Sequence, residues 1–359
     1  MSQAYWSPLV KTLVPYIPGE QPKVANLIKL NTNENPYPPS PLALQAMQQA
    51  VGEGLRLYPD PDAYALKQAI ADYYGVERQQ VFVGNGSDEV LAHAFMAFFK
   101  QDQPILFPDI SYSFYKVYAG LYEVDYKTVP LNEQFQIAVE DYQQPNGGII
   151  FPNPNAPTGC LLPLAAIEQV LQANPHRVII IDEAYIDFSK DESWLSVLKD
   201  FPNLIITQTL SKAYAMAGLR IGILYASREI IAVLNKIKPP YNINGLSQET
   251  AVKKLLQSTM PTQVRKILVE RNKLIEALSK SEFVEKIYPS DANFILIKVD
   301  DANFRYQQFI EKGVVVRNRS NQPLCENCLR ISIGTKEETE QIIELLKTFN
   351  NAEKSIIYR

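Results

Sequence analysis

The sequence contains few of the residues on which many enzymes depend, since only two of its 359 residues are histidine and three are cysteine. The shortage of histidine argues against a Ser–His or Cys–His catalytic pair. Cys325 and Cys328 have the C-x-x-C spacing of some zinc sites, but no second pair completes a set of four ligands. We therefore expect no metal and interpret the pair as incidental. Three cysteines are too few for a disulfide framework and suit a reducing, cytoplasmic setting.

The chain also lacks long runs of apolar or like-charged residues. Residues 1–8 show no basic stretch followed by an apolar run, so no export signal is expected. No segment approaches the length of a membrane span. The net charge of −4 is spread without long single-sign runs, which gives no reason to expect nucleic acid or an anionic membrane as a partner. The remaining expectation is a protein that acts on small organic molecules.

Short apolar, β-prone segments alternate with helical segments through the first two thirds of the chain. This alternation predicts an α/β fold with a mostly parallel sheet covered by helices on both faces. The predicted strands lie at residues 81–83, 104–107, 123–129, 148–151, 178–181, 204–207 and 220–225.

A proline-rich segment at residues 239–244 interrupts this alternation and is the candidate linker between two domains. A chain of this length is long for a single core, which also favours two lobes. We predict an N-terminal arm at 1–40, whose first thirty residues are extended. A large domain at 41–240 and a smaller α/β C-terminal domain at 241–359 follow it.

Lys212 lies among hydroxyl-bearing and small residues in the stretch 207–220, which is an unusual sequence environment for a lysine. A neutral lysine amine is a nucleophile toward carbonyl groups. Arg220 follows eight residues later, and a chain reversal allowed by Gly218 would let it hold an anion near that amine. The alternative is a solvated surface lysine.

Two other segments place polar groups at strand ends. The strand at 81–83 runs into the glycine turn of residues 84–86 and then into a helix, and free N–H groups at such a helix start can hold a phosphate. Asp182 ends the apolar strand 178–181 and is expected to be partly buried. A buried carboxylate needs a cation or hydrogen-bond donors, so a structural ion pair is the alternative there.

Together these residues match what pyridoxal phosphate requires of a protein. Asp182 would keep the ring nitrogen protonated, while Asn155 and Tyr185 would hydrogen-bond the ring oxygen. The aromatic side chain of Tyr112 would lie flat over the cofactor ring. Lys212 would form the Schiff base and then carry a proton between substrate and cofactor as general base and acid.

Several motifs resemble those of the class I and II aminotransferases, which have the aspartate aminotransferase fold. They are Leu30-Asn31-Thr32-Asn33-Glu34-Asn35-Pro36, Tyr58-Pro59-Asp60-Pro61, Asn153-Pro154-Asn155-Ala156-Pro157-Thr158-Gly159, Asp182-Glu183-Ala184-Tyr185, Ser211-Lys212, Gly218-Leu219-Arg220 and Leu329-Arg330-Ile331-Ser332-Ile333-Gly334. The resemblance covers nearly the whole chain. It implies that Ser87, Asp88, Ser211 and Arg220 surround the cofactor phosphate. It also implies a homodimer in which Tyr58 reaches the phosphate of the neighbouring subunit.

The same resemblance implies ping-pong transamination between L-histidinol phosphate and 2-oxoglutarate. It assigns Arg330 to the α-carboxylate of glutamate or the phosphate of histidinol phosphate, with Asn33 also at the substrate. Arg317 is a candidate second guanidinium, because the arginine fork binds both groups; a surface ion pair is the alternative. Tyr16 could add a hydroxyl from the arm.

Three other functions remain open at this stage. The same scaffold could transaminate aromatic amino acids or decarboxylate threonine phosphate. In a third alternative, from another class, the protein binds a phosphate ligand without catalysis, and Lys212 is only a charge partner.

Overall fold

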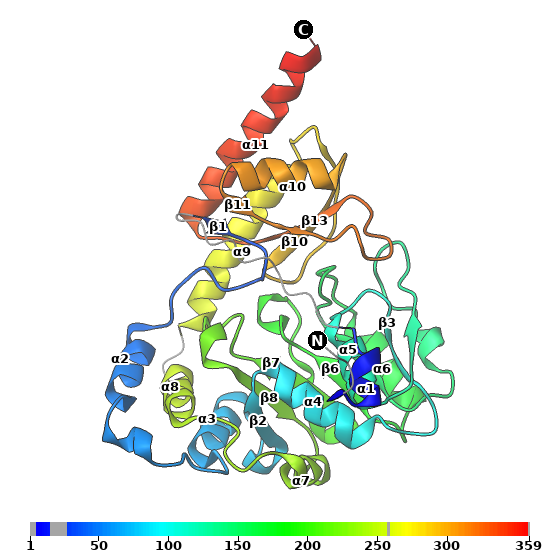
Figure 1. The fold of residues 1–359 in the computed structure, drawn as a ribbon, viewed down its shortest axis with the longest axis vertical. Coiled ribbons are helices and arrows are strands. Elements are labelled where there is room, and N and C mark those ends of the chain that lie inside the picture. The colour runs from blue at the N-terminus through cyan, green and yellow to red at the C-terminus, as the bar shows by residue number, and fades with distance from the viewer. Residues whose placement is uncertain (1–4, 15–26, 257–258, 358–359) are drawn as a thin grey trace.

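The computed structural model describes residues 5–14, 27–256 and 259–357, which form a large lobe and a smaller lobe beside it (Figure 1). A seven-stranded sheet forms the centre of the large lobe, in the order β2-β8-β7-β6-β5-β3-β4. Its strands are β2 (Val81–Asn85), β3 (Ile105–Pro108), β4 (Tyr126–Val129), β5 (Ile149–Pro152), β6 (Ile179–Asp182), β7 (Leu204–Thr209) and β8 (Ile221–Tyr225). The predicted α/β class is confirmed.

The sheet is mostly parallel, as predicted, with one exception. Neighbouring strands from β4 across to β7 pair in parallel. Strand β8 runs antiparallel to both β7 and β2. The reason is the connection: only the tight segment after Thr209 separates β7 from β8, and a parallel pair would need a long crossover.

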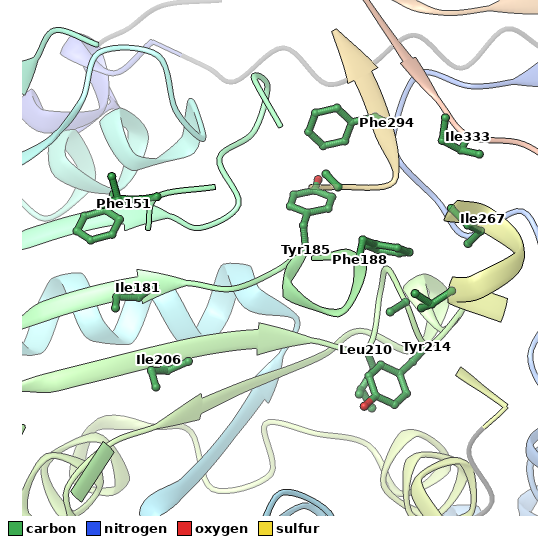
Figure 2. Packing of buried hydrophobic residues seen from close by; sticks show 14 of the residues in the cluster. Phe151, Ile181, Tyr185, Phe188, Ile206, Leu210, Tyr214, Ile267, Phe294 and Ile333 are labelled. Atoms are coloured by element: carbon green, nitrogen blue, oxygen red, sulfur yellow. The ribbon is translucent and has the colours of Figure 1, made fainter. Parts of the chain in front are cut away.

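The central strands are buried on both faces, which explains their continuous apolar sequence. Ile179 and Ile181 pack into one hydrophobic cluster, whereas Ile180 packs into another, because successive side chains point to opposite faces. All three are fully buried, and each contributes about 2 kcal/mol of apolar burial. Figure 2 shows Ile181 beside Ile206 on one face.

Helices cover each of these faces. Helices α4 (Ser87–Phe98), α5 (Phe114–Leu121) and α7 (Arg228–Ile237) supply the cluster around Ile180. Helices α3 (Tyr64–Tyr74) and α6 (Leu164–Ala173) supply the other. The amphipathic pattern of these segments therefore reflects one apolar stripe facing the sheet.

Two local signals in the sequence set helix ends. Ser40 precedes α2 (Pro41–Ala50), and its hydroxyl accepts a hydrogen bond of 3.3 Å from the amide of Ala43. Gly75 follows α3 with φ of 69°, the left-handed conformation that commonly ends a helix.

The small lobe contains a four-stranded antiparallel sheet in the order β12-β13-β10-β9. Its strands are β9 (Val284–Ile287), β10 (Phe294–Val299), β12 (Arg317–Asn318) and β13 (Cys328–Ser332), with helices α9 (Met260–Leu278), α10 (Ala302–Glu311) and α11 (Lys336–Ile357). Strand β1 (Ile28–Lys29) pairs in parallel with β11 (Val314–Val315), so residues 28–29 belong to the small lobe. The sequence analysis missed β1 and β9.

The structure departs from the predicted organisation near both ends of the large lobe. The first thirty residues were predicted to be extended, which is wrong for α1 (Pro8–Thr12), where Ser7 caps a helix that proline begins. Helix α8 (Gly245–Leu256) was not predicted, and it packs against α2 and α3 although it follows the proposed linker. The domain limits at 40 and 240 stay a prediction. None of the helices in the described part of the chain is both long and apolar enough to span a membrane.

Candidate active site

Two adjoining cavities lie where strands β5, β6 and β7 end. The first is lined by most of the predicted cofactor residues: Ser87, Asp88, Tyr112, Asp182, Tyr185, Ser211, Lys212 and Arg220. The second is lined by three of the predicted substrate residues, Asn33, Arg317 and Arg330. Tyr112, Ala156, Tyr185 and Lys212 line both cavities. The carboxyl edge of a parallel sheet is the usual place for a ligand in α/β proteins.

Lys212 lies in the turn after β7 and points between the two cavities. Its Nζ donates a hydrogen bond of 3.0 Å to the carbonyl of Thr32 and lies 5.7 Å from the centre of the Tyr185 ring. The side-chain amide of Asn35 donates to the carbonyl of Ala213, at 2.9 Å, and so ties the turn to the N-terminal segment. The half-buried lysine is therefore positioned by the protein, unlike a solvated surface lysine.

Asp182 ends β6 with its carboxylate buried at the base of the first cavity, 6% exposed. Tyr115 donates its hydroxyl at 3.0 Å and Thr207 at 3.2 Å. Burial raises the pKa of Asp182 to about 6, although these donors and a backbone N–H oppose the shift. The donors are neutral, so these hydrogen bonds do not form the structural ion pair that was the alternative.

Tyr185 links the lobes at the boundary of the cavities. Its hydroxyl accepts a hydrogen bond of 2.9 Å from the side-chain amide of Asn33. Ser332, at the end of β13, donates to the Asn33 side-chain oxygen at 2.9 Å. The Tyr185 ring meets Phe294 edge to face, with 5.3 Å between centroids (Figure 2). Because Tyr185 accepts from Asn33, its own proton stays available for a ligand.

The start of α4 and the guanidinium of Arg220 form a compact anion cradle. Gly86 has φ of 84°, and a Cβ there would collide with the Arg220 guanidinium. A Cβ on Gly222 would collide with the backbone of Gly86 and the amide of Ser87. Glycine at these positions lets the helix start, with its N–H groups and positive dipole end, approach the arginine closely.

Asp88 orients this cradle through its side chain. Its carboxylate accepts from Arg220 Nη2 and from the Tyr112 hydroxyl, each at 2.9 Å. Tyr118 donates to the Asp88 carbonyl, also at 2.9 Å. A carboxylate repels a phosphate, so Asp88 can serve an anion only through its backbone N–H and through the arginine that it holds.

The predicted role of Gly218 in the chain reversal is wrong. Gly218 sits in the short helical turn η7 (Ala217–Leu219), and the left-handed residues are Ala215, with φ of 58°, and Arg220, with φ of 56°. This conformation is uncommon for arginine. The contacts of its guanidinium with Asp88 and the carbonyl of Ala217 hold it there.

Two predicted site residues, Asn155 and Tyr58, do not line either cavity. Asn155 is buried, and its side-chain amide donates to the carbonyl of Ile110 at 2.9 Å; its neighbour Ala156 lines the cavities instead. Tyr58 is 80% exposed and stacks on Tyr241 with ring centroids 4.4 Å apart. Tyr16 lies outside the described residues.

The second cavity is strongly cationic. Arg317 on β12 and Arg330 on β13 are directly paired across the strands. Arg330 donates from Nη2 to the carbonyl of Asn31 at 2.8 Å and lies 5.2 Å from the Phe294 ring centre. Arg319, which the sequence analysis did not select, lines the same cavity. The described residues that line this cavity include no carboxylate.

The residues that orient Asp182 were not predicted from the sequence. Thr207 lies opposite Asp182 in the parallel pairing of β6 with β7. Its contact with Asp182 could have been predicted from the positions of the two residues at the ends of adjacent strands. Tyr115 follows Tyr112 by three residues, about one helical turn, but its contact with Asp182 depends on how α5 packs on the sheet.

Comparison with known families settles the relationship. The sequence profile described as "Aminotransferase class I and II" matches residues 25–346. The chain belongs to the class I and II aminotransferase family. This aminotransferase is 52% identical over 348 residues to a histidinol-phosphate aminotransferase of Pseudomonas putida, covering 95% of this chain and 99% of the relative.

Solved structures agree with this assignment. The histidinol-phosphate aminotransferase from Clostridium acetobutylicum has a TM-score of 0.85 and 26% identity, over 91% of this aminotransferase and 100% of that chain. The enzyme of the same name from Sinorhizobium meliloti, in complex with pyridoxal-5'-phosphate, has a TM-score of 0.86 and 23% identity, over 96% and 98% of the two chains. At that identity the second likeness concerns the fold alone.

Proposed function

We propose that this protein transfers an amino group between L-histidinol phosphate and 2-oxoglutarate, with pyridoxal phosphate as its cofactor. The observation that carries the proposal is the joining of two sites at Lys212. One contains a buried carboxylate and an anion cradle, and the other is lined by arginines. The near full-length likeness to a histidinol-phosphate aminotransferase supports the choice of substrate.

The residues of the first cavity fit the cofactor. Pyridoxal phosphate, when bound, supplies an aldehyde for an amine and a ring that takes up electrons released at the substrate Cα. The buried carboxylate of Asp182 has only neutral donors among its hydrogen bonds, and a cationic ring N–H suits it. The glycines at 86 and 222 keep open the helix start that a phosphate needs.

Asp182 keeps the ring nitrogen protonated in this proposal, while Tyr115 and Thr207 hold its carboxylate in place. Tyr185 donates a hydrogen bond to the ring oxygen, and Asn33 fixes the Tyr185 hydroxyl. Asn155 is not assigned this role, because its side-chain amide binds the Ile110 carbonyl and the residue does not line the cavity. These groups act by fixed orientation in a site shielded from water, where electrostatic contacts are strongest.

The phosphate end of the cofactor is assigned to Ser87, Asp88, Ser211 and Arg220, with Asp88 acting through its backbone. Ser211 is held by Thr209, whose hydroxyl lies 2.9 Å from that of Ser211. Tyr112 packs over the ring, positioned by its hydrogen bond to Asp88.

Lys212 has two tasks. Its amine would hold the cofactor covalently, and as a free amine it would move a proton to and from the substrate Cα. The hydrogen bond from Nζ to the Thr32 carbonyl keeps the amine at the junction of the two cavities.

The arginine-lined cavity receives the anionic end of each substrate. Arg330 binds the α-carboxylate of glutamate or the phosphate of histidinol phosphate, and Arg317 supplies a second fork. Asn33 also lines this cavity, and Tyr16 is proposed to add a hydroxyl to the substrate site. Two substrates that use the same cationic surface in turn are what a ping-pong mechanism requires.

We further propose that the protein is a cytoplasmic homodimer. Leu55, Leu57 and Tyr58 are 58%, 61% and 80% exposed, and such a cluster of exposed apolar side chains suits a subunit interface. Tyr58 would cross that interface to the cofactor phosphate of the neighbouring subunit. Free Cys160, Cys325 and Cys328 suit a reducing compartment.

The test is a half-reaction followed by absorbance. The pyridoxal form of the purified protein is mixed with histidinol phosphate, and its spectrum should convert to that of the pyridoxamine form; adding 2-oxoglutarate should restore it. Phenylalanine and threonine phosphate are tested in parallel, with carbon dioxide release measured for the latter. A faster reaction with phenylalanine would show that an aromatic amino acid is the preferred substrate. Release of carbon dioxide from threonine phosphate would show that the protein is a decarboxylase. If the protein stays colourless after incubation with pyridoxal phosphate, the proposed transamination is contradicted.

A further inference from the structure

Arg319 stands beyond the end of β12 but continues its pairing with β13. Arg317 lies opposite Arg330 and Asn318 opposite Leu329. The amide of Arg319 then donates to the carbonyl of Cys328 at 2.9 Å, which extends the ladder by one more residue. The backbone of Arg319 is therefore fixed by the sheet.

Strand alternation places the arginine side chains together. Residues 317 and 319 are two apart, so their side chains leave the strand on the same face. Asn318 leaves on the other face, where its side-chain amide donates to Asn303 at 2.8 Å. Arg317, Arg319 and Arg330 all line the second cavity, which Lys212 reaches from the opposite lobe.

Three guanidinium groups are more than a carboxylate needs. One arginine fork satisfies both oxygens of a carboxylate. A phosphate monoester carries a charge of about −1.5 to −2 at neutral pH and has three terminal oxygens. Three guanidinium groups that line one cavity offer enough N–H donors for the three terminal oxygens of this larger anion.

The two substrates differ in how far their anionic oxygens reach. In glutamate the α-carboxylate is attached directly to Cα, whereas in histidinol phosphate a methylene and an ester oxygen come before the phosphorus. The phosphate oxygens therefore lie two covalent bonds further from the reacting carbon. Arg330 binds the Asn31 carbonyl, next to the Thr32 carbonyl that Lys212 binds, whereas Arg319 pairs with β13 two residues further along, at Cys328. Arg319 is therefore the arginine placed to contact the phosphate without touching the carboxylate.

We propose that Arg319 binds the substrate phosphate but not the α-carboxylate of glutamate, and so sets the preference of this site for a phosphate monoester. Arg330 serves both ligands, and Arg319 discriminates between them. This inference rests on the proposed function, because it concerns the same substrate site.

The experiment compares Arg319→Gln with wild type in separate half-reactions. With histidinol phosphate, kcat/KM should fall by about 10- to 100-fold, mainly through KM, as expected for the loss of charged hydrogen bonds. With glutamate and with unphosphorylated histidinol, it should stay within about threefold. Arg319→Lys should fall between the two, because lysine keeps the charge but loses the planar fork. Arg228→Gln is the matched control, since Arg228 pairs with Glu77 on the exposed surface.

A second readout uses inorganic phosphate as an inhibitor of the glutamate half-reaction. Its inhibition constant should rise about tenfold in Arg319→Gln and stay constant in Arg228→Gln. Equal losses with glutamate and histidinol, or no loss with histidinol phosphate, would overturn the inference while the proposed function stands. Wild type could fail to convert histidinol phosphate while its inhibition by inorganic phosphate still depends on Arg319. That result would contradict the proposed substrate and support phosphate binding by Arg319. If Arg319→Gln fails to fold, Arg319→Lys takes its place in both assays.

Discussion

The two cavities of this aminotransferase are built in different ways. The first takes its side chains from the ends of elements that pack in the core of the large lobe: Asp182 from the fully buried strand β6, Lys212 from the turn after β7 and the anion cradle from the start of α4. The second takes its arginines from the short strand β12 and from β13. Buried strands fix a few groups in one geometry, whereas the arginine surface offers charge to more than one ligand.

This difference predicts two kinds of mutational effect. Changes in the first cavity should slow the reaction of every substrate, because the cofactor takes part in each half-reaction. Changes in the arginine cavity should alter affinity while leaving the chemistry intact. The following predictions test this separation, beginning with the largest effect.

Lys212→Ala should lower turnover by about 10⁴-fold or more with both amino donors, because it removes the nucleophile and the acid–base group together. Borohydride treatment should no longer add the mass of the cofactor to the protein. Unfolding by urea should change little, since among the described residues Lys212 donates a single hydrogen bond, to the Thr32 carbonyl. Ordinary turnover in this variant would contradict the assignment of the first cavity.

Asp182→Asn should lower kcat by about 10²- to 10³-fold for histidinol phosphate and glutamate alike, because an amide cannot stabilise a cationic ring nitrogen. Stopped-flow half-reactions measure both donors. Thr207→Val is a milder companion, since it removes one donor to Asp182 and keeps the side-chain shape. A loss confined to one donor would place Asp182 at the substrate instead of the cofactor.

The first cavity was also the more predictable from sequence, and the reason is physical. Apolar runs such as 178–181 identify buried strands, and the residue at the end of a parallel strand lies at the ligand edge of the sheet. Asp182 and Lys212 could therefore be placed together without coordinates. The α/β class followed from the same alternation.

What sequence could not supply were contacts between distant segments. The hydrogen bond from Tyr115 to Asp182 depends on helix packing, and Arg319 reaches its cavity only because β12 pairs with β13 in one register. Gly218 was favoured for the left-handed turn because glycine adopts it most easily, yet tertiary contacts impose it on Arg220. Helix α8 has a weakly apolar sequence, and packing on α2 and α3 decides its place.

A third prediction concerns the cofactor-free protein, in which Asp182 should make stability depend on pH. Its pKa is raised to about 6, from about 3.9 in an unfolded chain, so the folded state holds the proton more tightly. Stability should therefore fall as pH rises from about 4 to 6, by up to about 3 kcal/mol, and level off above that range. Buried Glu183, with a pKa raised by burial to about 7, adds a decline that continues to higher pH.

Urea unfolding midpoints of wild type and Asp182→Asn, measured at several values between pH 4.5 and 7.5, isolate this effect. The Asp182 part of the decline should vanish in the variant, while the Glu183 part stays in both proteins. The stability of wild type relative to the variant should therefore decrease with rising pH. A constant difference between the two proteins would mean that Asp182 is not buried as the structure has it.

The smallest effect belongs to the arginine cavity. Arg330→Lys should raise KM about tenfold for both glutamate and histidinol phosphate, because lysine keeps the charge but cannot bind two oxygens in parallel. Its kcat should stay within about threefold, since Lys212 and Asp182 are untouched. The hydrogen bond from Arg330 to the Asn31 carbonyl positions the guanidinium group for both ligands, so KM should rise for both substrates. Arg228→Lys, on the exposed surface, controls for the substitution itself. If kcat fell for both donors instead, the arginine cavity would be coupled to the chemistry, and the division between the two cavities would fail.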